Sequence, residues 1–223
     1  MNNSAIRPTP WDTAAFGMSC FDIIEASEAV LAHAATTPGH YSVKVDPLTS
    51  KALLHKYGFY YTDTLIEPFC KSSDVVEFKN PDITINSSVD IDLLLPMCDE
   101  SFLHGRFHRD FNLTSSKADL RYKQWLKQLS SECNVLGLFY RDELAGFIAH
   151  NKGSLLLHAI DAKFRGQGLA KYFWSTTCKK LADDGVQEIR SSISAGNLPV
   201  LNLYCSLGFR FRKAVDIYHR VTE

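Results

Sequence analysis

Beyond residue 88, apolar and polar residues follow the pattern of an α+β domain. Two long segments carry apolar residues at helical spacing, and short apolar runs typical of strands lie between them. The pattern predicts helices from Ser88 or Asp90 to about Phe102 and over 117–129 and 169–184, and strands over 134–140, 144–150 and 154–160. A strand, a helix and a strand follow. This order predicts a mixed, mostly antiparallel sheet flanked by helices.

Residues 1–80 are predicted to form a smaller α/β domain, and residues 81–223 the larger one. In the first segment the pattern predicts strands at 20–24, 40–45 and 59–69, and helices at 27–35 and 49–57. Gly58 is expected to end the second of these helices. The polar stretch 71–88 is expected to be a linker around a short strand at 75–78.

Part of the first segment is repeated in the second at a constant offset of 150 residues. Ser42-Val-Lys-Val matches Ser192-Ile-Ser, and Leu54 to Gly58-Phe59 matches Tyr204 to Gly208-Phe209. The first copy has Leu54 in place of the tyrosine, and no glycine turn precedes it. We therefore expect residues 1–80 to be a degenerate half-repeat without chemistry of its own.

Composition narrows the function classes. The 223 residues include 24 basic and 25 acidic ones, and this balance gives no electrostatic footprint for nucleic acid. No apolar run has the length of a membrane span, and the N-terminal residues lack the apolar core of a signal peptide. Six scattered cysteines predict reduced thiols in the cytoplasm. His104 and His108 lack further ligands nearby in the sequence, so no metal is expected.

A glycine-containing turn is the strongest candidate site. The strand at 154–160 leads into Arg165-Gly-Gln-Gly-Leu-Ala170, where the helix begins. Gly166 and Gly168 permit backbone angles and close approaches that a side chain forbids, and the helix start offers unpaired N–H groups. This arrangement suits a phosphate or pyrophosphate, although a tight strand-to-helix turn has the same local pattern. Neither the dinucleotide fingerprint nor the Walker motif is present.

The residues of this turn and those that follow resemble a known family. Arg165-x-x-Gly168-x-Ala170 resembles the acetyl-CoA pyrophosphate signature of the GNAT N-acetyltransferases, and Asn197, Tyr204 and Gly208-Phe209 follow in the order typical of that family. The resemblance implies a GNAT fold and acetyl-CoA as co-substrate. It also implies that the backbone of Arg165, Gly166, Gln167, Gly168, Leu169 and Ala170 holds the pyrophosphate.

The same resemblance implies roles for other residues. The strand at His158, Ala159 and Ile160 is expected to splay from its neighbour at a bulge, to pair with pantetheine and to direct one N–H at the thioester oxygen. Asn197 would bind pantetheine or, alternatively, only cap a helix. Tyr204 would be the general acid that protonates the thiolate or, alternatively, a half-buried structural tyrosine. The general base stays unassigned; His158 has a suitable pKa but is equally a packed strand residue.

Further short matches bear on the acceptor. Trp11-Asp12, Phe16-Gly17, Gly105-Arg-Phe107 and Gln124-Trp-Leu126 are similar to the dTDP-fucosamine acetyltransferases, which acetylate a nucleotide-linked 4-amino-4,6-dideoxygalactose. This similarity implies a small nucleotide-sugar substrate. Its diphosphate would contact Arg106, His108 and Arg109, and its base would stack on Phe107 or Phe111.

Other functions fit the same residues. The basic segment 104–109 is also consistent with a solvated turn. A different amine, such as a protein N-terminus, a polyamine or an antibiotic, remains an alternative acceptor. A non-enzymatic acyl-CoA-binding module is a third alternative, and a homodimer is possible.

Overall fold

The computed structural model describes residues 5–223. The strands are β1 (Ile6–Pro8), β2 (Cys20–Ile23), β3 (Gly39–Val45), β4 (Tyr60–Lys71), β5 (Ile83–Asn86), β6 (Asn134–Tyr140), β7 (Glu143–Asn151), β8 (Ser154–Ile160), β9 (Glu188–Ser191), β10 (Ile193–Ser194) and β11 (Arg210–Thr222). The α-helices are α1 (Pro10–Phe16), α2 (Glu28–Thr36), α3 (Ala52–Lys56), α4 (Ile91–Leu94), α5 (Ser115–Glu132), α6 (Ala170–Asp183) and α7 (Leu198–Ser206). Short 3-10 turns are η1 (Ser72–Asp74), η2 (Leu95–Cys98) and η3 (Ala162–Phe164).

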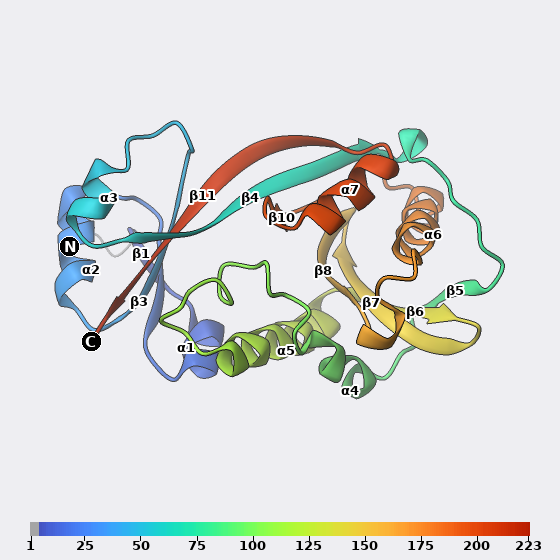
Figure 1. The fold of residues 1–223 in the computed structure, drawn as a ribbon, viewed down its shortest axis with the longest axis horizontal. Coiled ribbons are helices and arrows are strands. Elements are labelled where there is room, and N and C mark those ends of the chain that lie inside the picture. Colours follow the sequence, from blue (N-terminus) through green and yellow to red (C-terminus); the bar gives the residue numbers. More distant parts are fainter. Residues whose placement is uncertain (1–4) are drawn as a thin grey trace.

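All strands belong to one mixed sheet, in the order β1-β2-β3-β11-β4-β9-β8-β7-β6-β5, with β10 paired to β4 (Figure 1). Within the described residues, only the pairs β2/β3 and β8/β9 are parallel, and a helix connects the strands of each pair. The remaining pairs are antiparallel, as hairpins and neighbouring connections favour. This confirms the predicted α+β class with a mixed, mostly antiparallel sheet.

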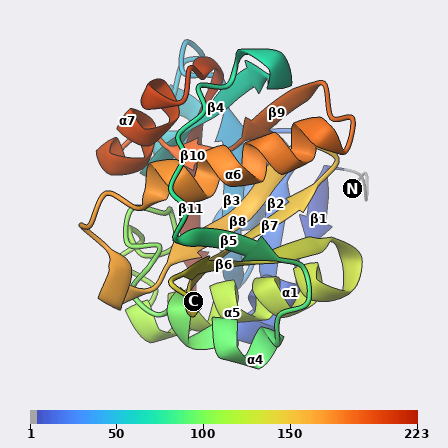
Figure 2. The ribbon, with the colours of Figure 1, turned by 90° about the vertical axis from the view of Figure 1, so that its right-hand side faces the viewer.

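Helices cover both faces of the sheet around β7 and β8 (Figure 2). On one face α6 and α7 bury a cluster that includes Phe173, Trp174 and Ile189. On the other face α1 and α5 bury a second cluster that includes Phe147 and Leu126. A third cluster lies under α2 and α3. None of the helices in residues 5–223 is both long and apolar enough to cross a bilayer.

The two long strands β4 and β11 join the two parts of the chain (Figure 1). β4, from the first 80 residues, lies between β9 and β11, while β11, from the C-terminus, lies between β4 and β3. Each part thus contributes its last strand to the sheet of the other. The sheet is continuous across the predicted boundary at residue 80, and a division of the chain at that point stays a prediction.

The two parts repeat the same element order. A strand, helix, strand, helix and strand form residues 20–71, and the same order returns over residues 154–222. Gly58 and Gly208 both have left-handed φ angles, of 71° and 87°, and Phe59 N and Phe209 N each donate to the carbonyl five residues earlier at 3.0 Å. In the pairing of β4 with β11, Tyr60 lies opposite His219 and Phe69 lies opposite Arg210. A shift of 150 residues converts the first pair into the second, because Tyr60 corresponds to Arg210 and His219 to Phe69. The structure therefore supports the half-repeat.

The strand predicted at 75–78 is wrong. Val76 N donates to Leu207 O at 3.0 Å and Phe78 N to the Ser175 hydroxyl at 2.7 Å, so this backbone is bound to helices α6 and α7. The edge strand is instead β5, which pairs with β6. The apolar residues at 75–78 are typical of a strand, but Val75 and Phe78 pack against the cluster under α6 and α7.

The helix predicted from Ser88 or Asp90 to Phe102 is also too long. Asp90 is the cap, and its carboxylate accepts from Asp92 N at 3.0 Å. The α-helix ends at Leu94, and one 3-10 turn follows to Cys98. Pro96 explains the early end, because proline lacks the N–H that would continue the helix and its ring crowds the preceding turn.

Candidate functional site

The glycine turn connects β8 to α6 through η3. Gly166 and Gly168 have φ angles of 75° and 72°, a left-handed conformation that favours glycine. A Cβ atom added to either residue would meet nothing within 4 Å, so the turn is open on its outer side. Residues 165–168 are exposed, whereas Leu169 is buried and fixes the start of α6.

Unpaired backbone amides gather at this turn. The N–H groups of residues 166–171 make no hydrogen bond to any described residue. They precede or open a helix of 14 residues, whose dipole adds partial positive charge at the same place. Arg165 lies beside them, and its guanidinium donates to Ile160 O at 2.8 Å and to the Ser101 hydroxyl. Such a group of donors can bind a pyrophosphate.

The strand before the turn separates from its neighbour. β8 pairs with β9 only at Ser154↔Arg190 and Leu155↔Ser191. Its pairing with β7 changes register between Leu155 and Leu157, which leaves Leu156 as an extra residue. A bulge of this kind bends a strand and increases its twist. The predicted splay at a bulge is therefore present in the structure.

The bulge also decides where side chains and backbone groups point. Leu155 packs in the cluster under α6 and α7, whereas Leu157 and Ala159 pack in the cluster under α5, on the opposite face. His158 lies on the α6 side and contacts Trp174. Asp161 N donates to Ala145 O on the β7 side, so the alternating backbone groups of His158 and Ile160 face the open edge. The opening between β8 and β9 is called the wedge below.

Tyr204 lies beside the wedge on α7. Its side chain is fully buried, and its hydroxyl is 3.4 Å from both Trp174 Nε1 and His158 Nε2. Burial raises the pKa of the Tyr204 hydroxyl above its usual value, so the phenol stays protonated. Burial also lowers the pKa of the His158 imidazole to about 4, so His158 is neutral near pH 7. The phenol therefore retains a proton that it can donate.

Asn197 caps α7 at the other end of the same helix. Its Oδ1 accepts from Val200 N at 3.3 Å, and its backbone N donates to Ser194 O at 3.0 Å. The capping role is thus observed. Its side-chain amide nitrogen makes no hydrogen bond to a described residue, and its contact with pantetheine stays a prediction.

The basic segment at 104–109 is not a solvated turn. His108 Nε2 is 2.9 Å from Asp119 Oδ1, and Arg109 Nη1 is 2.8 Å from Asp63 Oδ1. The expectation that Phe107 stacks on a base is wrong, because its ring is 2% exposed and packs against Phe16 in the core. Phe111, the alternative, is 97% exposed.

Arg106 lies above Phe107, with its guanidinium carbon 4.5 Å from the ring centre. Its Nε atom is buried without a hydrogen-bond partner, and it forms no ion pair with a described residue. Burial, together with the nearby Arg121, lowers the pKa of the Arg106 guanidinium from its usual value. Arg106 is therefore the member of the basic segment whose charge is least compensated.

Asp63 is a candidate functional residue that no sequence pattern predicted. It lies on β4, is fully buried, and accepts from Arg109 and, at 2.7 Å, from the Ser194 hydroxyl. Its other oxygen, Oδ2, has no partner, and burial raises the pKa of this carboxyl group above its usual value. Asp63 is 131 residues from Ser194 in the chain, so no local pattern could have connected them.

The histidines give a second unexpected result. His104 and His108 do not form a ligand set, and His108 binds Asp119 instead. A group able to ligate a metal is found elsewhere, at His40, Asp110 and His219, all buried. The six cysteines are free, and four of them are buried.

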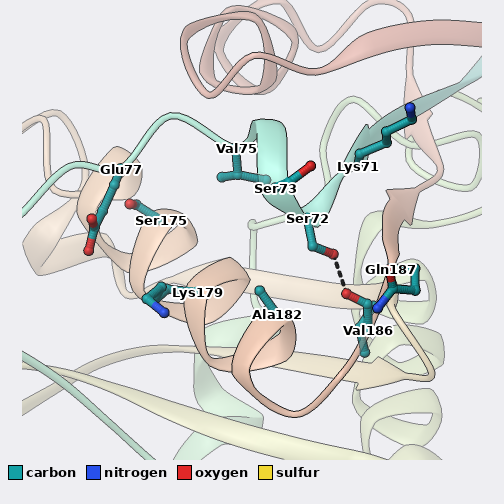
Figure 3. A pocket seen from close by; sticks show the side chains of 10 residues that line it. All are labelled: Lys71, Ser72, Ser73, Val75, Glu77, Ser175, Lys179, Ala182, Val186 and Gln187. Atoms are coloured by element: carbon teal, nitrogen blue, oxygen red, sulfur yellow. Dashed lines mark hydrogen bonds between the residues drawn. The ribbon is translucent and has the colours of Figure 1, made fainter.

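A surface groove of about 460 Å³ lies on the outer side of α6. Its walls are α6, through Ser175 and Lys179, and the segment 71–77, where the Ser72 hydroxyl donates to Val186 O (Figure 3). None of the predicted site residues lines it. The groove is therefore separate from the glycine turn and the wedge.

Comparison with known proteins agrees with this geometry. Residues 108–218 match a family model described as an acetyltransferase (GNAT) domain. No curated protein matches the sequence. A GCN5-related N-acetyltransferase from Sphaerobacter thermophilus is similar in structure, with a TM-score of 0.57 and 14% identity, over 84% of this chain and 61% of that one. The chain thus spans less than two thirds of that relative.

Two further structures share the fold. A protein of Novosphingobium aromaticivorans described as a GNAT-family acetyltransferase has a TM-score of 0.57 and 15% identity, over 100% of this chain and 91% of that one. A tandem GNAT protein from the clavulanic acid biosynthesis pathway has a TM-score of 0.56 and 12% identity, over 91% and 75%. At such identities these likenesses show the fold. The family match places an acetyltransferase (GNAT) domain in residues 108–218, and the glycine turn lies within these residues.

Proposed function

We propose that the protein transfers acetyl groups directly from acetyl-CoA to the amino group of a nucleotide-linked amino-deoxysugar of the dTDP-4-amino-4,6-dideoxyhexose type. One observation supports the acetyl-CoA part most strongly. The unpaired amides of residues 166–171 lie at the end of β8, whose edge opens where its pairing with β9 ends after Leu155. A pyrophosphate on the amides would place a pantetheine arm along that edge.

Different residues around the wedge would then bind different parts of acetyl-CoA. Arg165 and the backbone from Gly166 to Ala170 would hold the pyrophosphate. The backbone groups of His158 and Ile160 would pair with pantetheine, with Ala159 between them and Asn197 on the opposite side. An N–H from this edge would stabilise the thioester oxygen as it gains negative charge.

Tyr204 would act as the general acid. The acceptor nitrogen attacks the thioester carbon, the new C–N bond forms, and the C–S bond breaks. The departing thiolate takes the phenolic proton of Tyr204, and the proton lost by the amine restores the phenol through solvent. Contact between the Tyr204 hydroxyl and His158, whose backbone faces the wedge, supports this role. Trp174 donates to the same oxygen, so the phenolic proton of Tyr204 is not used in that contact.

The acceptor is inferred from the loop 99–114. Arg106 lacks a counter-ion, and Arg109 lies 3.7 Å from the position that a Cβ of Gly196 would take, beside Asn197. A guanidinium group beside Asn197, together with the uncompensated charge of Arg106 on the same loop, favours a phosphorylated acceptor such as a nucleotide sugar. The free cysteines agree with a reducing compartment, and we place the enzyme in the cytoplasm.

One observation favours a second candidate, a phosphate-free amine such as a polyamine or an antibiotic. Asp63 has a buried oxygen without a partner beside Ser194 and Arg109. A carboxylate in this position would attract an ammonium group and repel a diphosphate. The two candidates therefore differ in whether the charge of Arg106 or that of Asp63 governs the acceptor site.

The test is turnover of acetyl-CoA by the full chain, with the released coenzyme A measured by chromatography. The acceptors are dTDP-4-amino-4,6-dideoxygalactose, the same amino sugar without the nucleotide, spermidine, kanamycin and a peptide with a free N-terminus. We expect kcat/KM to be about ten-fold or more higher with the nucleotide sugar than with the free sugar.

Each outcome separates the candidates. Preference for spermidine or kanamycin would support the Asp63 alternative and contradict the nucleotide sugar. Tight binding of coenzyme A by calorimetry without turnover of any acceptor would indicate a binding module. Absence of coenzyme A binding would contradict the whole proposal.

A further inference from the structure

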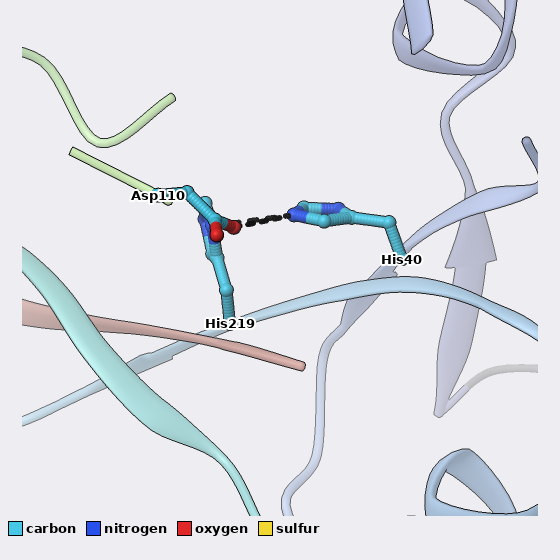
Figure 4. A group of neighbouring side chains, drawn as sticks. All are labelled: His40, Asp110 and His219. Carbon is cyan, nitrogen blue, oxygen red and sulfur yellow. Dashed lines mark hydrogen bonds and ion pairs between the residues drawn. The ribbon is translucent and has the colours of Figure 1, made fainter. Parts of the chain in front are cut away.

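Three buried side chains from distant parts of the sequence converge outside the wedge (Figure 4). His40 belongs to β3, Asp110 to the loop between η2 and α5, and His219 to β11. Their exposed fractions are 2%, 1% and 0%. Neither the family match nor the proposed acetyl transfer gives these residues a task.

The atoms that meet are two imidazole nitrogens and one carboxylate oxygen. His219 Nδ1 is 2.8 Å from Asp110 Oδ2, His40 Nε2 is 3.4 Å from the same oxygen, and the two nitrogens are 3.2 Å apart. In a tetrahedral site with zinc–ligand bonds of about 2.0–2.2 Å, neighbouring ligand atoms lie about 3.4 Å apart. The observed triangle is close to one face of such a tetrahedron.

Hydrogen bonds alone satisfy this triangle only when both nitrogens that face Asp110 are protonated. If both nitrogens are protonated, two N–H groups 3.2 Å apart point at one oxygen. If only one of the two nitrogens is protonated, the lone pair of the other faces the negative carboxylate, unless it accepts the one N–H that is present. A cation at the centre would accept a lone pair from each of the three atoms. It would also neutralise Asp110, a fully buried carboxylate that forms no ion pair with Lys or Arg.

We propose that His40 Nε2, His219 Nδ1 and Asp110 Oδ2 bind a divalent transition-metal ion of the zinc type. Two imidazoles and one carboxylate suit zinc, and three protein ligands leave one position for water. Softer thiolate ligands are not involved, and an all-oxygen set that calcium or magnesium would need is absent from this group.

The surroundings hold the carboxylate in the orientation that the site requires. Tyr60 donates to Asp110 Oδ1 at 2.9 Å and lies 3.1 Å from Oδ2, and Asn112 N donates to Oδ1 at 3.0 Å. These contacts hold the carboxylate with Oδ2 toward the two histidines. Partners that fix a ligand from behind are usual at metal sites.

Such an ion would join the neighbouring strands β3 and β11 to the loop that carries Asp110. It would fasten the loop that carries Arg106 and Arg109 to β3 and β11 near the centre of the sheet. The site would therefore stabilise the fold and position the acceptor loop without contacting the thioester.

The test is metal content of the purified, tag-free full chain, measured by mass spectrometry after growth with zinc. We expect about one zinc ion per chain. The variants Asp110→Asn and His219→Ala should each lose at least about nine tenths of it, because removal of one ligand weakens a three-ligand site severely. His150→Ala is the matched control, because His150 is also a buried strand histidine but lies outside the group.

A second measurement keeps the test independent of how the variants fold. Cobalt added to metal-free wild-type protein should give the visible absorption of a tetrahedral ion, and zinc should raise the Tm of wild type but not of Asp110→Asn. Wild-type protein that holds no stoichiometric zinc and shows no cobalt spectrum would overturn the site. Equal metal loss in His150→Ala would also overturn it. None of these readouts depends on acetyl-CoA, so failure of the metal site is distinguishable from failure of the proposed function.

Discussion

The two half-repeats share a fold but differ where a cofactor would bind. β2 and β3 pair in parallel over four residues, from Cys20↔His40 to Ile23↔Val43, whereas β8 and β9 pair over two residues and then separate. The connection after β2 contains no glycine, whereas the one after β8 contains Gly166 and Gly168. The parallel strand pair of the first half therefore has no opening, whereas that of the second half leaves the wedge between its strands.

Other equivalent positions have also diverged. The residues 150 positions from His40 and His219 are Arg190 and Phe69, so each proposed histidine ligand occurs in one half without an equivalent in the other. Leu54, in turn, stands where the second half has Tyr204, and both side chains are buried. The two half-repeats therefore share a backbone fold and differ in a few side chains, on which the proposed functions depend.

The largest effect is expected when the halves are separated. Residues 81–223 expressed alone would lack β4, which lies between β9 and β11. Without it both strands lose a hydrogen-bonded neighbour, and we expect no cooperative thermal unfolding transition by circular dichroism. Co-expression with residues 1–80 should restore the transition. A cooperative fold of residues 81–223 alone would show that the halves are independent.

The next largest effect should follow removal of the Tyr204 hydroxyl. Tyr204→Phe is expected to lower kcat by about 100-fold or more, because general acid catalysis contributes on that scale. Leu54→Met, a volume-conserving change at the equivalent buried position, should leave kcat unchanged. The measurement is turnover of acetyl-CoA at saturating acceptor. Unchanged kcat in Tyr204→Phe would return this residue to a structural role.

A smaller effect is expected at the turn. Gly168→Ala should weaken coenzyme A binding about ten-fold, because a Cβ strains the left-handed backbone and disturbs the amides that face the pyrophosphate. Gly185→Ala is the matched control: Gly185 also has a left-handed φ, of 87°, and open space, but it follows the C-terminal end of α6. Calorimetry should find normal affinity in the control. Equal losses of coenzyme A affinity in both variants would show that backbone strain alone causes the effect.

The smallest effect concerns stability in acid. The pKa of His158 falls from the usual 6.5 to about 4 in the fold, so the unfolded chain takes up this proton at a higher pH than the folded chain. Stability should therefore decrease as the pH falls from 6.5 towards 4 and level off below that for this group. His158→Gln should make the decrease shallower in urea titrations, while His150, whose pKa burial also lowers, maintains part of it. An identical slope would show that His158 does not contribute.

Much of the fold, including the glycine turn and the strand and helix around it, could be predicted from local sequence. The strand at 154–160, the glycine turn and α6 were predicted within about a residue because their apolar pattern, turn glycines and helix start act locally. The strand at 75–78 and the long helix at 90–102 were wrong for different reasons. The backbone of the first segment forms hydrogen bonds to residues of α6 and at the end of α7 instead of to a strand. The second segment is interrupted by Pro96.

By itself, then, the sequence determined the order of most elements, the glycine turn and the half-repeat, because short-range geometry and periodicity encode them. Only the tertiary structure decided that β4 lies between β9 and β11, that Arg109 pairs with Asp63, and that His40 and His219 meet at Asp110. Those contacts join residues 46 to 179 positions apart. Their partners are selected by packing and by the need to compensate buried charge, which no local pattern of residues records.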